Sequence, residues 1–334
     1  MAREEFEDAI ATTNLLPGPA STQLAIYCAW RQRGFAGALI GAVGFILPGL
    51  VMIIGLSALF FSSSPPHWVV GAAAGAGAGV PAIALFAASQ LAPTSWRRAA
   101  VAANTKWRWL IYVAAGAATS VALPQYVVLT MVACGAVEIS IGSGAQAAFP
   151  LVMGKVAVAG AIGSIAWVAL KVGALSYGGG FVIIPLMQHD VVSTYHWMSS
   201  AQFLNAVALG QITPGPVVQT VSAVGYAARG LTGALLAAVV AFTPSFLFVV
   251  LGGRHFQSIR SNDKVTGFLR GAGPCVIGAI FGSAISLESQ LAHWWQIPVL
   301  LAVGAWVFSK RNAVVALLAG GGVGVIVALT HTAV

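Results

Sequence analysis

Charged side chains are scarce in this chain of 334 residues. Asp, Glu, Lys and Arg make up 7% of it, and none of them occurs between Arg33 and Arg97. A soluble domain carries roughly 25% charged residues, and hydrophobic residues here reach 58%. The composition therefore excludes an ordinary soluble domain. The net charge of +8 does not indicate nucleic-acid binding, because the basic residues flank apolar stretches, where they orient membrane helices.

Residues that would indicate a metal centre, a disulfide framework or an enzyme are also few. Cys28, Cys134 and Cys275 are far apart, with no CxxC pair, so we interpret them as apolar packing residues. The sequence has no HExxH or GxSxG motif and no paired acidic motif. We expect no cofactor and no metal ion. A membrane-embedded enzyme stays as an alternative that no cluster of acidic residues or histidines favours.

Long apolar runs predict an all-α, polytopic membrane protein. A spanning helix needs about 20 apolar residues. The runs occupy residues 35–61, 68–91, 109–123, 125–142, 156–176, 231–252, 271–288, 294–309 and 312–330. We expect the chain to cross the lipid bilayer of the plasma (inner) membrane many times.

One apolar region is interrupted between Gln211 and Thr220, by the triplet Pro214-Gly215-Pro216. Proline lacks a backbone donor and clashes with the preceding turn, so a helix must end at the triplet and restart after it. Lipid cannot pair the freed backbone groups, so the break must face protein or a water-filled cavity. A helix that restarts there directs N–H groups and partial positive charge at the cavity, which suits an anion.

The same element occurs a second time, between Asn14 and Gln23, around the triplet Pro17-Gly18-Pro19. An Arg-Gly pair follows each triplet, at Arg33-Gly34 and Arg229-Gly230. The triplets are 197 residues apart and the Arg-Gly pairs 196. The spacing of 196 continues with Pro48 and Pro244, Gly75 and Gly271, and Gly77 and Gly273. The chain therefore contains an internal duplication, and paired interrupted segments point to the binding site of a transporter.

We assign residues 1–145 to the first repeat and 155–334 to the second, each with a broken or re-entrant helix. The segments 62–67 and 289–293 carry no Lys or Arg. Their counterparts, 253–267 (with Arg270 just beyond) and 92–108, carry several. This opposite bias predicts two inverted homologous repeats, with the site at their interface near the membrane midplane.

The first repeat lacks the start that the second repeat has. Met1 falls opposite Met198, so the segment 156–176 and the glycine run after it have no counterpart. We expect that either the coding sequence begins upstream of Met1 or the short form is genuine.

The candidate anion ligands fall into three groups. Backbone amides after each triplet and nearby side-chain donors form the first: Asn14, Pro17, Gly18, Pro19, Thr22, Gln23, Gln211, Pro214, Gly215, Pro216, Gln219 and Thr220. The run Gly178, Gly179 and Gly180 is either a simple turn or a re-entrant turn that exposes amides. Three cations form the third group. Lys171 lies deep in an apolar span and can attract an anion, whereas Arg33 and Arg229 either neutralise helix C-termini or capture the anion at the cavity mouth.

Together these motifs resemble the chromate ion transporter (CHR) family. The matching features are the glycine run, Trp197, Phe203, Gln211, the triplets, the Arg-Gly pairs, Gly233-Ala234 and Pro244, with the first half matching from Phe6 to Pro48. Members look like two homologous halves of opposite orientation that export chromate, a tetrahedral divalent oxyanion. The resemblance implies a secondary transporter with alternating access, tied to sulfate or proton gradients. Sulfate is nearly isosteric with chromate, so a transporter of sulfate or another anion is an alternative. We also consider a homodimer.

The charge pattern makes a prediction about topology. Reporters fused within 92–108 and within 253–267 should both be cytoplasmic, and a reporter within 62–67 should be external, because Lys and Arg are retained inside. Reporter activity in intact cells measures this. If the matching segments 62–67 and 253–267 lie on the same side, the repeats are not inverted.

Overall fold

The computed structural model describes residues 3–13, 18–100, 106–143, 160–176, 180–253 and 262–330. These residues form helices, and no strand occurs among them. Five helices within the described ranges are long and apolar enough to cross a membrane: Ala20–Phe60, His67–Arg97, Pro124–Ile141, Val217–Gly252 and Asp263–Glu288. The expected all-α, polytopic fold is confirmed.

The helices follow the predicted apolar runs closely. They are α1 (Arg3–Thr13), α2 (Ala20–Phe60), α3 (His67–Ala100), α4 (Lys106–Ala122), α5 (Val127–Ser143), α6 (Ala161–Leu175), α7 (Ile184–Gln188), α8 (Ser200–Ile212), α9 (Thr220–Gly252), α11 (Asp263–Glu288), α12 (Gln296–Phe308) and α13 (Ala313–Leu329). Short 3₁₀ turns η1 (Pro124–Tyr126), η2 (Phe181–Ile183) and η4 (Val217–Gln219) and the π-helix η3 (His189–Thr194) complete the described chain. The main difference concerns two polar helix ends. The helix α3 continues beyond the run 68–91 to Ala100, and α11 begins before the run 271–288, at Asp263.

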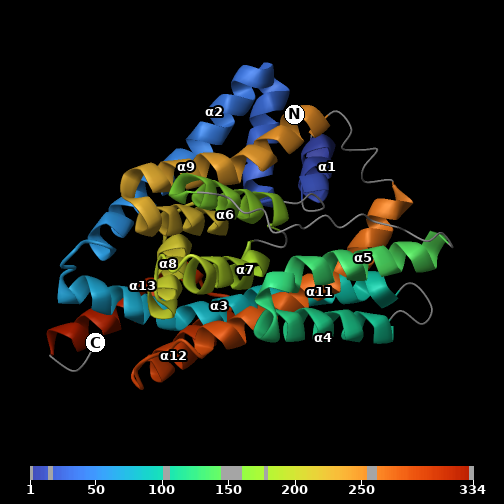
Figure 1. Ribbon diagram of the computed structural model, residues 1–334. Coiled ribbons are helices and arrows are strands. Elements are labelled where there is room, and N and C mark those ends of the chain that lie inside the picture. The colour runs from blue at the N-terminus through green and yellow to red at the C-terminus, as the bar shows by residue number, and fades with distance from the viewer. Residues whose placement is uncertain are drawn as a thin grey trace.

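Two long helices, α2 and α9, are each a hairpin of two arms. Non-helical angles interrupt α2 at Arg33 (φ −136°, ψ 21°) and Gly34 (φ 58°, ψ −142°). The same angles recur in α9 at Arg229 (φ −154°, ψ 30°) and Gly230 (φ 60°, ψ −150°). Glycine alone adopts this backbone region readily, so each Arg-Gly pair forms the tip of a hairpin. Figure 1 shows the two arms of α2 meeting at such a tip.

The core helices of each repeat pack against helices of the other repeat. In the first repeat α3 packs against α12 and α13 of the second, whereas α11 of the second packs against α4 and α5 of the first (Figure 1). The helix α2 also packs against α9, and α3 against α11. These contacts join the two repeats into one unit.

Glycines allow these helices to approach backbone to backbone. A Cβ at Gly75 of α3 would overlap the carbonyl oxygen of Gly320 in α13, and a Cβ at Gly278 of α11 would overlap that of Val113 in α4. Small residues at contacts of this kind drive helix association in lipid, where the hydrophobic effect between helices is absent. The packing between the repeats therefore depends on these positions.

We predict that Gly75→Val destabilises the protein by about 1–3 kcal/mol, because the added methyl groups force α3 and α13 apart. Thermal unfolding of the detergent-purified protein measures this. Gly44→Val in α2 is the matched control, since a Cβ at Gly44 meets nothing within 4 Å. Equal melting temperatures of the two variants would contradict the role of the close approach.

Candidate anion site

The described residues of the two Pro-Gly-Pro triplets have similar local geometry. The helix α8 ends at Ile212, and the chain resumes as a helix with η4 and α9. Gly215 has φ +129° and Gly18 has φ +113°, while Pro216 and Pro19 are extended at the starts of their helices. Helices α1 and α8 begin 197 residues apart, at Arg3 and Ser200, the spacing of the triplets themselves.

Each break packs against the second arm of the other repeat's hairpin. A Cβ at Gly49 of α2 would overlap the carbonyl oxygen of Pro214. A Cβ at Gly18 would lie 2.5 Å from the Ser245 hydroxyl of α9. Gly49 and Ser245 are 196 residues apart and therefore occupy equivalent positions. The duplication thus brings the two breaks together by the same contact, made once in each direction.

The end of α6 and the described end of the glycine run lie between the breaks. The backbone N–H of Gly18 donates to the carbonyl oxygen of Ser176, at 2.5 Å. Gly180 is left-handed, with φ +91°, and the position of a Cβ there is 3.2 Å from the Cβ of Val217. Gly180 therefore packs against the first turn after the second triplet. Four other candidates, Asn14, Pro17, Gly178 and Gly179, lie outside the described residues.

A cavity of about 750 Å³ lies against both breaks, within the range typical of ligand sites. The triplets and the first turns after them contribute Gly18 to Ser21 and Gly215 to Val217. Polar residues from the last turns of α3, including Gln90, Thr94 and Ser95, line the adjoining wall, and α11 lines another. The first turn of a helix leaves N–H groups without intrahelical partners, so two sets of backbone donors adjoin one cavity.

Arg270 of α11 is the only charged residue among the described residues that line the cavity. By sequence alone, Arg270 belongs with the basic residues that set the orientation of the helices. Its helical spacing would have indicated its position at the cavity. Arg270 precedes Gly273 by three residues and Ile277 by seven, so the three residues share one face of the helix. With two helix starts and one guanidinium, and with no acidic residue among those described lining residues, the site is electropositive.

Polar side chains without partners concentrate around the breaks. Among the described residues with buried polar atoms that find no hydrogen-bond partner, six belong to the breaks and the helices beside them: Thr22, Ser176, Gln211, Gln219, Ser222 and Ser245. Thr22 and Gln219 stand at equivalent places, five residues after the first proline of their triplets. An unpaired buried polar group costs about 1–3 kcal/mol, so such a group requires an explanation. A polar ligand or water near the breaks would supply the missing partners.

Gln23 and Thr220 are also buried, beside their triplets. The Thr220 hydroxyl donates to the carbonyl oxygen of Val217, at 2.8 Å, which fixes the first turn after the second break. By contrast, Arg33 and Arg229 are exposed at the hairpin tips. The first arms place them roughly 20 Å from the breaks at 1.5 Å per residue, so the structure does not bring them to the cavity.

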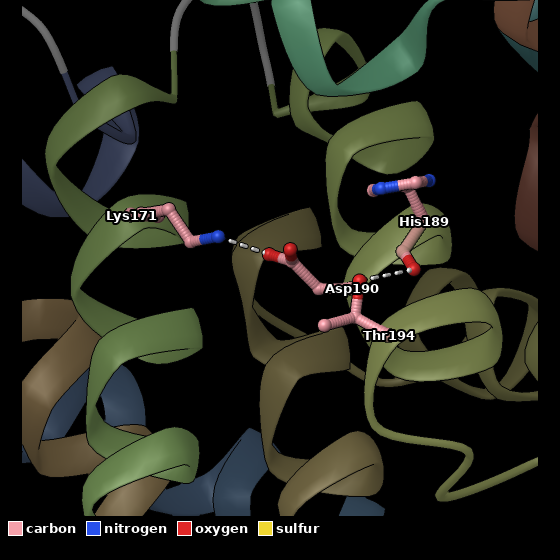
Figure 2. A network of polar contacts seen from close by, with 4 residues as sticks. All are labelled: Lys171, His189, Asp190 and Thr194. Atoms are coloured by element: carbon pink, nitrogen blue, oxygen red, sulfur yellow. Dashed lines mark hydrogen bonds and ion pairs between the residues drawn. The ribbon is translucent and has the colours of Figure 1, made fainter. Parts of the chain in front are cut away.

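Lys171 lies apart from the cavity and pairs with Asp190. Figure 2 shows the ammonium group of Lys171, on α6, directed at the carboxylate of Asp190, on η3. Their side chains are 13% and 10% exposed, and the Lys171 ammonium also lies 5.6 Å from the centroid of the Trp167 ring. The charge of Lys171 is therefore neutralised inside the second repeat.

We predict that Lys171→Leu or Asp190→Leu alone destabilises the protein by about 3–5 kcal/mol, because each leaves an uncompensated buried charge. The double variant should recover most of this loss, since apolar pairs replace buried ion pairs with little cost. Thermal unfolding in detergent measures all three. A double variant no more stable than the singles would show that the pair is not the reason for their instability.

A helical chain with several membrane-spanning helices and an electropositive cavity between two broken helices has the architecture of a membrane transport protein. The family described as chromate transporter matches residues 1–139 and 163–325, and the chain belongs to this family.

Curated relatives agree with this assignment. The chromate transport protein of Cupriavidus metallidurans is 32% identical over 303 residues, which cover 86% of this chain and 73% of the relative. The probable chromate transport protein of Synechococcus elongatus is 28% identical over 339 residues, 93% of this chain and 82% of the relative. The chromate transport protein of Pseudomonas aeruginosa is 27% identical over 353 residues, 96% of this chain and 82% of the relative. No solved structure matches the chain.

Proposed function

We propose that this protein exports chromate across the plasma (inner) membrane, through the cavity that the two broken helices share. The observation that carries the proposal is that both Pro-Gly-Pro breaks, 197 residues apart in sequence, line one electropositive cavity. Membership of the chromate transporter family supports chromate as the substrate.

The chemistry of the cavity suits a divalent oxyanion. Each helix start supplies about half a unit of positive charge together with unpaired N–H groups. A tetrahedral oxyanion presents acceptors in four directions, so it can meet donors from two opposed helix starts at once. The buried side chains of Thr22 and Gln219 add candidate donors beside the two breaks. The site would thus bind the anion mainly through backbone groups that cannot be removed by side-chain substitution.

An asymmetry between the repeats supports alternating access. The cavity is lined by Arg270, Gly273 and Val276 of α11. Their counterparts in α3, 196 residues earlier, are Ala74, Gly77 and Val80, which are buried. The Asn205 side chain packs against Gly77, and α12 and α13 pack against α3. We propose that the two repeats exchange these arrangements, so that the α3 positions line a cavity open to the other side.

The direction of access follows from the position of the lining residues. The cavity extends from the breaks towards Ala99 at the end of α3 and Leu269 near the start of α11. The basic segments 92–108 and 253–267 include the end of α3 and the start of α11, and the positive-inside rule assigns both to the cytoplasm. The structure would then be the state that receives the anion from the cytoplasm. Net export requires a coupled gradient, for which sulfate and protons are the candidates.

Uptake of labelled chromate into inside-out membrane vesicles tests the proposal, with vesicles lacking the protein as the control. We expect saturable, protein-dependent uptake that sulfate inhibits weakly. Uptake of labelled sulfate that chromate inhibits only weakly would favour the sulfate transporter instead. Absence of flux for both anions would overturn the proposed function.

We predict that Gln219→Leu raises the chromate concentration for half-maximal uptake by roughly tenfold, because it removes a buried donor worth about 1.5 kcal/mol at a charged ligand. Gln125→Leu is the matched control, since Gln125 is exposed in η1. Melting temperatures distinguish the two roles of Gln219. If the leucine variant melts higher and keeps the wild-type half-saturation, then Gln219 is not a ligand.

A further inference from the structure

We infer that Arg270 binds the transported anion in only one of the two facing states and so gives the two sides of the membrane different affinities. The inference rests on the proposed function and deepens it, because it assigns a specificity-determining residue. Its basis is the combination of cavity lining, register between the repeats and the absence of a paired cation.

The register places no cation opposite Arg270 in the first repeat. The glycine pairs Gly75 and Gly271 and Gly77 and Gly273 fix the spacing at 196, which aligns Arg270 with Ala74. Ala74 is 8% exposed and belongs to the main apolar core, whereas Arg270 is exposed and lines the cavity. The core helices α3 and α11 are therefore equivalent in position but not in charge.

The alternative explanation is that Arg270 is an interfacial anchor, whose side chain extends from the helix to the membrane interface. Two observations favour a ligand instead. Arg270 faces a cavity that both breaks line, and within the described ranges it forms no ion pair that would neutralise it. Asp263, on the same helix, is about two turns away at 3.6 residues per turn.

The chemistry of the guanidinium matches the substrate. Its N–H groups form a planar, positively charged fork that binds two oxygens of an oxyanion together. In the opposite facing state the corresponding wall would carry the methyl group of Ala74, which offers neither charge nor donor. The anion would then be captured tightly on the side where Arg270 is exposed and released more readily on the other.

The experiment compares labelled chromate uptake from the two faces, in inside-out and right-side-out vesicles. Arg270→Ala should raise the half-saturating concentration at the cytoplasmic face by roughly tenfold to a hundredfold, the range expected for a charged hydrogen bond. The external face should keep the wild-type value. Arg270→Lys, which retains the charge but not the fork, should lie between the two. Arg97→Ala is the matched control, since Arg97 is exposed near the end of α3 but does not line the cavity.

The outcomes separate this inference from the proposed function. If the wild type transports chromate but Arg270→Ala changes both faces equally, Arg270 does not act in one state only. If neither face changes, Arg270 is an orientation anchor. Reporter fusions and melting temperatures on Arg270→Ala and Arg270→Lys show whether each variant keeps its topology and fold. A wild type without chromate flux would instead remove the proposed function itself.

Discussion

The rest of the structure depends on one constraint, which is that backbone groups at membrane depth need partners. A Pro-Gly-Pro triplet frees the N–H groups of the helix that follows it, and hydrocarbon cannot pair them. The chain meets this requirement by placing each break against protein. The carbonyl oxygen of Pro214 lies over Gly49, and the N–H of Gly18 donates to Ser176. Residues of both breaks line the cavity, so the element that is hardest to accommodate in lipid also shapes this cavity.

Duplication is what turns a local break into a shared cavity. A single broken helix would present one set of donors to whatever covered it. Here each break packs against the hairpin of the other repeat. The helices α3 and α11 pack mainly against helices of the opposite repeat. Neither repeat can therefore bury its own core helix alone. The glycines along these contacts keep the helices close enough for the two breaks to line the same space.

The sequence predicted the features that depend on backbone chemistry and periodicity. Apolar runs located the helices, and the triplets located the breaks. The Arg-Gly pairs, expected at helix C-termini or at a cavity mouth, are instead the tips of hairpins with similar angles. Features that depend on long-range side-chain contacts were not accessible. Lys171 and Asp190 are 19 residues apart with a glycine run between them, and nothing in the sequence indicates that they pair. The cavity position of Arg270 was hidden by its place beside a basic loop, where an arginine usually orients the helix.

The two repeats share their geometry more closely than their chemistry. The φ angles of Gly18 and Gly215 and the backbone angles of the two hairpin tips agree within about the normal scatter of regular structures. The side chains at equivalent places differ: Thr22 stands where the second repeat has Gln219, and Ala74 where it has Arg270. In the alternating access that we propose, similar geometry would let each repeat adopt the arrangement of the other at little cost. Unequal side chains would then make the two facing states bind the same anion differently, so a nearly symmetric backbone could still distinguish the two sides of a membrane.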